Sequence, residues 1–371
     1  MQIKVRREKL YRYIQVLETI TPTKSVVPIL QNLKIAAVRG DLMLFATDLE
    51  VGLQYILREG CEIIEGGEIL LPAKKLADTL QELDDEEIII KAEDGTCLIK
   101  PTYEGRWFYK FLVIDASNFP QFPKIEKSST PVELELVDFK DMVNKTSFSV
   151  SDGIANYALS GILLESLKNE FRMVSTDGVR LSLVKREIVG GKLKPFKAIV
   201  PVKAIRILEK IVDDEKRFSI YFDETTMQIK LSNGIFFSRL IEGNFPDYEE
   251  VIPQKYKIKV AIPLDKFISR LRTILVFASE RAKTVKLILK KGSLQLYTTS
   301  NETGEAFTKE IPVDYSGEDF SIVLNPVFLS DVSRVINDEM IYLYFNEGTT
   351  APVIVKEKDD YIHLIMPISV Q

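Results

Sequence analysis

Apolar side chains recur at intervals of three and four residues in six separate segments of the chain. This spacing places them on one face of an α-helix. In the first segment the apolar positions are Leu10, Ile14 and Leu17. The pattern therefore predicts six short amphipathic helices. They cover residues 7–20, 73–82, 138–147, 203–213, 264–272 and 327–336.

Between the helical segments lie short β-rich runs such as GEILLP, EIIIKA, RFSIYF and VKLILKK. These runs alternate apolar and polar residues or are apolar throughout. Gly, Asp, Asn and Lys residues separate them, which is typical of antiparallel strands joined by tight turns. The combination favours an α+β fold, with the helices segregated on one face of antiparallel sheets.

The same order of elements occurs three times: an amphipathic helix, a strand that ends in threonine, and a proline that opens a second helix. Corresponding markers are 123 to 129 residues apart, and three independent markers with one period indicate a structural repeat. The markers are Leu10, Phe139 and Phe267; Thr47, Thr176 and Thr299; and Pro72, Pro201 and Pro326. An Asn-Phe-Pro sequence ends each of the first two copies, at 118–120 and 244–246. The chain is predicted to contain three similar domains, at residues 1–126, 127–254 and 255–371, each with two helices and antiparallel sheets.

Charge is unevenly divided between the helices and the rest of the chain. The 371 residues carry a net charge of -5, which by itself does not favour a nucleic-acid binder, because such domains are usually basic. The six helical segments, however, contain 14 basic and 10 acidic residues, so the remainder carries -9. One interpretation is a helical surface that contacts phosphate without reading base sequence. The alternative is that Lys and Arg are simply favourable on helix surfaces.

Sequence motifs for catalysis, metal binding or cofactor binding are absent. The one histidine, His363, and the two cysteines, Cys61 and Cys97, are interpreted as strand residues, and no phosphate-binding glycine loop occurs. Gly-Gly pairs at 66–67 and 190–191 are interpreted as turns. We therefore expect a non-enzyme without cofactor or metal. The absence of a signal-peptide pattern and of a membrane-spanning apolar run predicts a cytoplasmic protein.

Four stretches of the sequence resemble one known family: VVPILQNLKIAAVRGDLMLFATDLEVGL, STDGVRLS, IEGNFPDYEEVIP and the terminal strand with Met366 and Pro367. Over the whole chain, in order, they are similar to the bacterial sliding clamps, the DNA polymerase III beta subunit family. The resemblance implies a head-to-tail homodimer whose six domains close a ring around double-stranded DNA, with helices inside and sheets outside. Such a clamp has no catalytic activity. It tethers the polymerase III alpha subunit, the clamp loader delta subunit, other DNA polymerases and repair proteins, and so confers processivity.

The family binds short, partly apolar clamp-binding motifs in a pocket between its second and third domains. Aliphatic walls, an adaptable Met and a rigid Pro suit such a groove. The matching positions are Leu159, Thr176, Gly178, Arg180, Leu181, Pro246, Val251, Leu364, Met366 and Pro367. The alternative is that many of these are ordinary core residues, and it applies most to Leu181 and Val251. The end Ile368-Ser369-Val370-Gln371 departs from the common Met-Arg-Leu ending, and Val179 replaces a frequent His, so motif preference is expected to differ.

The resemblance also implies DNA-contacting and subunit-interface residues. The DNA-contacting positions are Lys24, Lys74, Lys75, Tyr157 and Lys203, with Lys140, Lys145, Lys266 and Arg270 added from helix position alone. Glu250 and Val202 stand where other clamps can carry a basic residue. At the interface, Tyr109 and Phe111 of one subunit would contact Val276 and Phe277 of the other. The apolar stretch 107–114 is then an edge strand that the dimer covers. The alternative is a strand fully buried within its own domain.

Two other functions stay open on the sequence alone. One is a partner-binding scaffold of the same fold that does not encircle DNA. The other is an enzyme that uses carboxylates such as Asp48 and Asp177, which follow the repeated threonine. Because the third copy has Ser300 at that position, a turn-forming aspartate is the favoured interpretation.

Overall fold

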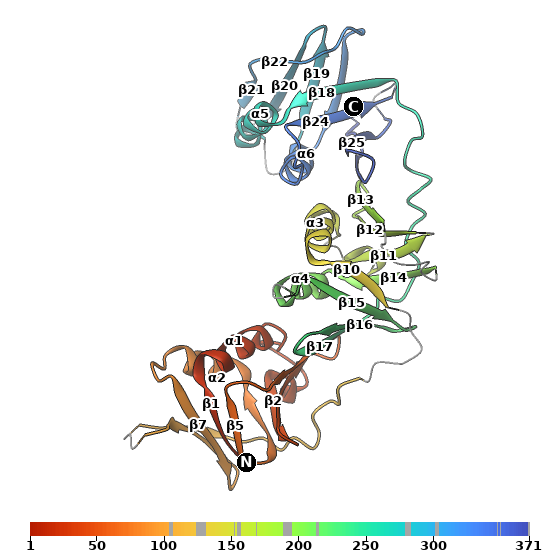
Figure 1. The fold of residues 1–371 in the computed structure, drawn as a ribbon. Helices are drawn as coiled ribbons and strands as arrows, with labels where there is room; N and C mark the ends of the chain where they lie inside the picture. Colours follow the sequence, from red (N-terminus) through yellow and green to blue (C-terminus); the bar gives the residue numbers. More distant parts are fainter. Residues whose placement is uncertain are drawn as a thin grey trace. The chain divides into compact units, whose positions relative to one another are not determined.

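The computed structural model describes residues 1–103, 107–123, 131–151, 153, 157–167, 169–187, 195–212, 215–278, 283–300, 304–346, 348 and 350–369. Within these residues all six predicted helices are present (Figure 1). The predicted segment 264–272 was too short, because the apolar face continues through the buried Ile274. The helices are α1 (Arg7–Glu18), α2 (Ala73–Gln81), α3 (Leu136–Thr146), α4 (Val202–Ile211), α5 (Leu264–Phe277) and α6 (Pro326–Ser333).

The segments Met1–Val137 and Lys203–Leu240 form one compact unit with two antiparallel sheets. The five-stranded sheet has the order β5 (Cys61–Glu65), β1 (Gln2–Arg6), β7 (Glu87–Glu93), β8 (Thr96–Pro101), β9 (Tyr109–Leu112). The eight-stranded sheet has the order β10 (Val132–Glu135), β15 (Arg217–Phe222), β16 (Thr226–Leu231), β17 (Gly234–Arg239), β4 (Val51–Leu57), β3 (Asp41–Thr47), β2 (Asn32–Val38), β6 (Gly67–Pro72).

A second compact unit consists of Asp138–Val202 and Ile241–Gln371. Its eight-stranded sheet has the order β14 (Phe196–Pro201), β11 (Gly161–Leu167), β12 (Glu170–Thr176), β13 (Arg180–Glu187), β26 (Tyr361–Ile365), β25 (Val353–Glu357), β24 (Met340–Phe345), β18 (Ile258–Pro263). The other sheet has the order β21 (Gly304–Phe307), β20 (Ser293–Ser300), β19 (Val285–Lys290), β23 (Phe320–Leu324), and β22 (Ile311–Pro312) pairs with β20. Three short 3-10 turns are η1 (Pro28–Gln31), η2 (Ser147–Ser149) and η3 (Tyr157–Ser160).

The two compact units differ from the three sequence repeats because strand pairing crosses the repeat junctions. β4 of the first repeat pairs with β17 of the second, and β13 of the second pairs with β26 of the third. Each pairing continues one eight-stranded sheet through two repeats. The middle repeat is therefore shared between the units. Of the predicted boundaries, the one after residue 126 lies outside the described residues, as does the Gly-Gly pair at 190–191.

Two pairs of helices pack side by side. α1 buries Leu10, Ile14 and Leu17 and lies beside α2, and α5 lies beside α6 (Figure 1). The marker prolines stand where strands end and helices begin. Pro72 ends β6 directly before α2, and Pro326 occupies the first turn of α6, where its missing N–H needs no partner.

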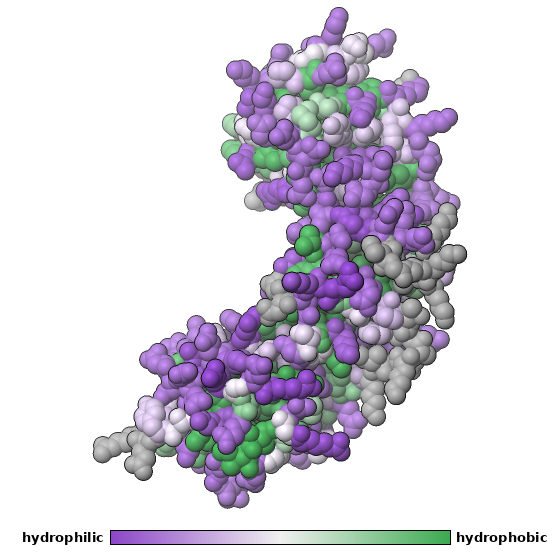
Figure 2. Space-filling model, in the orientation of Figure 1, coloured by the Kyte–Doolittle hydropathy of each residue, from purple (hydrophilic) through white to green (hydrophobic). Residues whose placement is uncertain are grey.

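The Asn-Phe-Pro sequences place phenylalanines on the two eight-stranded sheets. Phe119 packs edge-to-face on Phe45, with ring centroids 5.4 Å apart, in a cluster that includes Phe237. In the second copy, Phe245 packs against the apolar cluster around Leu181. Each Asn-Phe-Pro segment thus packs on an eight-stranded sheet to which the strand preceding the segment does not belong. Figure 2 shows that hydrophilic side chains cover most of the visible surface, while hydrophobic ones are confined to smaller areas.

Candidate functional site

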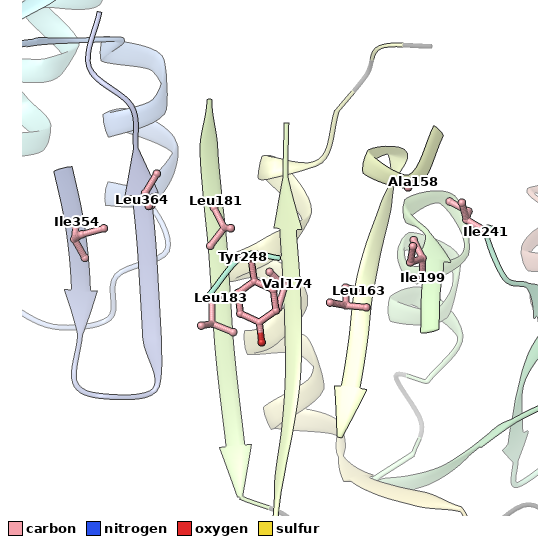
Figure 3. Close-up of a cluster of buried hydrophobic side chains, with 10 residues drawn as sticks. All are labelled: Ala158, Leu163, Val174, Leu181, Leu183, Ile199, Ile241, Tyr248, Ile354 and Leu364. Atoms are coloured by element: carbon pink, nitrogen blue, oxygen red, sulfur yellow. The ribbon is translucent and has the colours of Figure 1, made fainter. Parts of the chain in front are cut away.

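Part of the predicted groove lies on one face of the second unit's eight-stranded sheet, while Arg180, next to Leu181 on β13, points to the opposite face. Thr176 on β12 is opposite Leu181 on β13, and Leu181 is opposite Leu364 on β26. Leu181 and Leu364 are each 3% exposed and belong to one apolar cluster with Ala158, the neighbour of Leu159 (Figure 3). The sheet thus joins segments distant in sequence into one apolar floor. Leu181 is a core residue of that floor.

Exposed side chains surround this floor. Met366 is 38% exposed and Val251 is 50% exposed, so the interpretation of Val251 as a core residue was wrong. Gly178 and Pro246 are also exposed, while Leu159 and Pro367 are half-buried. The rim residues, unlike Leu181 and Leu364, can contact a ligand without any movement of the sheet.

Backbone hydrogen bonds tie the C-terminal segment to the Gly178–Val179 turn and to β23 of the other sheet. The Met366 N–H donates to the Val179 carbonyl at 2.9 Å, and the Ile368 N–H donates to the Val323 carbonyl at 2.9 Å. Met366 and the Gly178–Val179 turn therefore lie side by side. Substitution of Ile for the family's Met at 368 leaves this backbone link in place. Val370 and Gln371 lie outside the described residues.

A buried polar anchor holds the segment that carries Pro246 and Val251. Tyr248 is 4% exposed; Arg172 donates to its hydroxyl at 3.0 Å, and the hydroxyl donates to Glu165. Burial, and then the hydrogen bond with Glu165, raise the pKa of Tyr248, so it stays a neutral donor. Nothing in the sequence pattern indicated this anchor.

The guanidinium of Arg180 is engaged by its own chain. It forms ion pairs with Asp177 at 2.9 Å and Asp331 at 2.7 Å, and it lies 4.2 Å from the ring centroid of Phe328. These contacts fix α6 against the start of β13. Arg180 therefore positions the groove wall, and Phe328 and Asp331 join the site as residues that the motif comparison missed.

The repeated Thr-Asp sequences form the same turn in both units. Thr47 Oγ1 donates to the Val51 carbonyl at 2.7 Å, and Thr176 Oγ1 donates to the Arg180 carbonyl at 2.6 Å. In both turns the aspartate that follows accepts two backbone N–H bonds through Oδ1, at 2.8 to 3.1 Å. The turn-forming interpretation of Asp48 and Asp177 is confirmed, and these carboxylates are occupied by structural bonds.

The five predicted DNA-contacting residues are all exposed. Lys24, Lys74 and Lys75 extend from the first unit, and Tyr157 is 59% exposed on the second. Lys203 is 49% exposed at its side chain and forms an ion pair with Asp48. Near Lys24 in the same loop, Val26 is fully exposed.

The assignment of Lys145 to a DNA surface was wrong. Its side chain is 4% exposed, and Nζ lies 3.0 Å from Asp141 and 2.5 Å from Glu357. Asp141 also pairs with Arg186, which pairs in turn with Asp360 at 2.6 Å. Asp141, Lys145, Arg186, Glu357 and Asp360 thus form a partly buried ion network. Of the other three helix-based candidates, Lys266 is exposed, and Arg270 donates to the Lys309 carbonyl at 3.3 Å; Lys140 also has a partner within the chain.

The apolar stretch 107–114 is an edge, so the alternative of a strand buried within its own domain was wrong. β9 ends the five-stranded sheet, with Tyr109 43% and Leu112 77% exposed. In the second unit, Val276 on α5 is 74% exposed. There β21 is also a terminal strand, and its Phe307 is 57% exposed. Phe307 is a further interface candidate that the sequence comparison missed.

The two cysteines are protonated thiols on strands, Cys97 buried and Cys61 half-buried. Burial raises the pKa of Cys97 to about 12 and that of Cys61 to about 11, which keeps both thiols protonated. Both cysteines and His363 lie on strands, as predicted. Among the described residues, no group of three or more His, Cys, Asp or Glu side chains could hold a metal ion. In the same residues, no helix combines the length and apolar character needed to span a membrane.

His363 should make the protein less stable in mild acid. It is fully buried beside Ser182, and burial, then the charge of Arg180, lower its pKa to about 3. Below pH 6.5 the histidine of the unfolded state binds a proton that the folded state excludes. The free energy of unfolding therefore decreases as the pH is lowered. Urea unfolding should show a loss of about 2 kcal/mol between pH 7.5 and pH 5.

The matched variant is His363→Asn, which removes the only histidine. Its unfolding free energy should change much less over the same pH range. An equally steep pH dependence in this variant would assign the effect to other groups.

Three α+β repeats, exposed apolar side chains beside one sheet and exposed lysines on helices, with no candidate metal cluster among the described residues, are typical of a clamp-type binding protein. Sequence models of the DNA polymerase III beta subunit match its N-terminal domain at residues 1–123, its central domain at 133–247 and its C-terminal domain at 249–369. The chain belongs to the DNA polymerase III beta subunit family, the beta sliding clamps. As a member of this family it is a non-catalytic processivity factor of DNA replication.

Full-length relatives agree with this assignment. The beta sliding clamp of Chlamydia pneumoniae is 27% identical over 99% of both chains, and that of Pseudomonas putida is 29% identical over 99% of this chain and 100% of its own. The DNA polymerase III beta subunit structure from Pseudomonas aeruginosa is 26% identical, with a TM-score of 0.92 over 100% of both chains. The Bacillus subtilis clamp structure, at 23% identity and a TM-score of 0.94, shares the fold.

Proposed function

We propose that two copies of this chain associate head to tail, as three-domain subunits, into a ring that encircles double-stranded DNA without sequence preference. The observation that carries the proposal is the pair of apolar edges. β9 exposes Tyr109 and Leu112 in one unit, and β21 exposes Phe307 in the other. An exposed apolar edge strand promotes aggregation unless another strand covers it. Pairing of β9 with β21 of a second copy would cover both edges and close the ring.

Contacts with the DNA backbone are supported by the exposed Lys24, Lys74, Lys75 and Lys203. Lysines that contact phosphates would hold the duplex and tolerate sliding, because such contacts do not depend on base sequence. Tyr157 adds an exposed hydroxyl. We place this activity in the cytoplasm.

The groove formed by Leu181, Leu364 and the rim residues Val251 and Met366 is proposed to bind the clamp-binding motifs of partners. The buried aliphatic floor and exposed methionine rim suit short apolar segments. The proposed partners are the polymerase III alpha subunit, the clamp loader delta subunit, other DNA polymerases and repair proteins. A shared groove makes these partners compete.

Linearising the DNA should release the protein. A clamp loader loads the protein onto nicked circular DNA, and gel filtration removes the unbound protein. The DNA is then cut once, and the protein that stays bound is measured. A topological link predicts near-complete loss from the cut DNA within the time of the assay, while uncut circles retain the protein. Cut DNA whose ends are blocked by bound streptavidin is the control and should also retain it. Equal retention on circular and open-ended DNA would contradict encirclement.

A partner-binding scaffold of the same fold is the alternative function. Burial of Lys145 and the pairing of Lys203 with Asp48 favour it, because both reduce the charge available for DNA. A native mass near 42.3 kDa at micromolar concentration, without assembly on circular DNA, would support this alternative. Twice that mass would support the ring.

A further inference from the structure

Three tyrosines and two lysines form a surface strip at the far side of the second unit's eight-stranded sheet. The rings of Tyr256 and Tyr344 are 5.0 Å apart. Lys259 Nζ lies 4.9 Å from the ring centroid of Tyr342, and Lys356 Nζ lies 4.7 Å from that of Tyr256. We call these five residues the tyrosine–lysine strip.

The strip continues the floor of the proposed peptide groove. Strand register gives one row across the sheet: Leu181, Leu364, Ile354, Tyr344 and Lys259. Tyr256 and Tyr344 pack against the same apolar cluster that contains Leu181 and Leu364. Figure 3 shows Leu181, Leu364 and Ile354 of this row. From Leu364 to Lys259 is three strand spacings, about 14 Å, which an extended peptide covers in about four residues. A segment seated in the groove can therefore reach the strip.

The charge of the strip is not neutralised by the described part of the chain. Neither Lys259 nor Lys356 has a carboxylate oxygen within 4.0 Å there, and their ammonium groups lie over tyrosine rings instead. The segment 253–260, PQKYKIKV, has three lysines and no acidic residue. Aromatic rings beside cations hold the ammonium groups in place at the surface. The chemistry of the strip fits a ligand with carboxylates.

We propose that the tyrosine–lysine strip is a second subsite of the groove, which binds acidic residues that flank an apolar clamp-binding segment. This inference rests on the proposed peptide-binding function. The apolar segment contacts the exposed rim residues Val251 and Met366 beside the buried Leu181 and Leu364, and the flanking carboxylates pair with Lys259 and Lys356. The strip thus ranks partners that share the same apolar core by the charge of their flanks.

Fluorescence anisotropy with three labelled peptides tests the proposal. One peptide contains only a short segment of leucine and phenylalanine with polar spacers. The other two add four glutamates at its N-terminal or C-terminal end. At low salt, one flanked peptide should bind about 5- to 10-fold tighter than the unflanked peptide, and the gain should fall as salt rises. In Lys259→Glu/Lys356→Glu the gain should disappear, while the unflanked affinity stays within about twofold.

Lys290→Glu/Lys291→Glu is the matched control, because it makes the same charge change at the exposed β19–β20 turn of the other sheet. This variant should keep the gain. The proposed role of the strip would be overturned if neither glutamate flank increased peptide affinity, or if both variants lost the increase equally. Either result would leave the groove assignment intact. Failure of the unflanked peptide to bind would instead overturn the groove, and with it the strip.

Discussion

Removal of residues 366–371 is expected to weaken binding of an apolar clamp-binding peptide by at least about 30-fold, and to leave the dimer intact. The deletion takes away the exposed Met366 rim and the hydrogen bond from its N–H to the Val179 carbonyl. It also uncovers the edge of the floor at Leu364. β26 ends at Ile365, so the sheet keeps all its strand pairs. Peptide affinity by anisotropy and mass by light scattering measure the two effects separately.

A chain that ends at Ser369 is the matched control for this truncation. It keeps Met366 and the Ile368 N–H bond to Val323, so its peptide affinity should stay within about twofold of the full chain. Retained affinity in the chain that ends at Ile365 would refute the groove assignment. A truncated chain that becomes monomeric would show that the segment contributes to the dimer instead.

Lys145→Met should lower the free energy of unfolding of the second unit by about 3–5 kcal/mol. The substitution leaves the carboxylate of Glu357, which is 6% exposed, without its cation. An unpaired buried charge costs far more than the intact pair contributes, because desolvation is no longer offset. Urea unfolding monitored by circular dichroism measures the change.

The double variant Lys145→Met/Glu357→Gln removes both charges and should recover most of the lost stability. The exposed pair Lys91–Glu93 in the first unit is the contrasting case, and Lys91→Met should cost less than about 1 kcal/mol. Equal losses in the single and double variants would show that packing of the lysine stem, rather than charge burial, holds this region together.

The repeat could be recognised from the sequence because its markers are set by local physics. A proline at a helix start lacks an N–H where none is needed, and a threonine at a strand end donates a hydrogen bond to a nearby carbonyl. Both depend only on neighbouring backbone, so they recur in the same order along the chain. The Thr47 and Thr176 turns show this directly, since each is closed by hydrogen bonds within four residues. Helix positions followed from apolar spacing for the same reason.

Whether a charged side chain is exposed depends on contacts with residues distant in the sequence, which the local pattern does not predict. Lys145 and Lys203 both lie on predicted helices, yet one is buried against Glu357 and the other is exposed beside Asp48. Their partners are 212 and 155 residues away along the chain. Helix periodicity predicts which face a lysine occupies, but not what packs against that face. Arg180 is similar, because its partner Asp331 comes from α6.

The sequence by itself determined the α+β class, the six helices, the threefold repeat and the family, because these depend on periodicity and on short motifs. Only the tertiary structure decided that β13 and β26 join Leu181 to Leu364, that β9 is an open edge, and that the middle repeat is shared between two units. It also placed Tyr344 and Lys259 of the tyrosine–lysine strip in the same cross-strand row as Leu181 and Leu364. Pairing between distant strands depends on the register of whole sheets, which the apolar pattern of one strand alone does not specify.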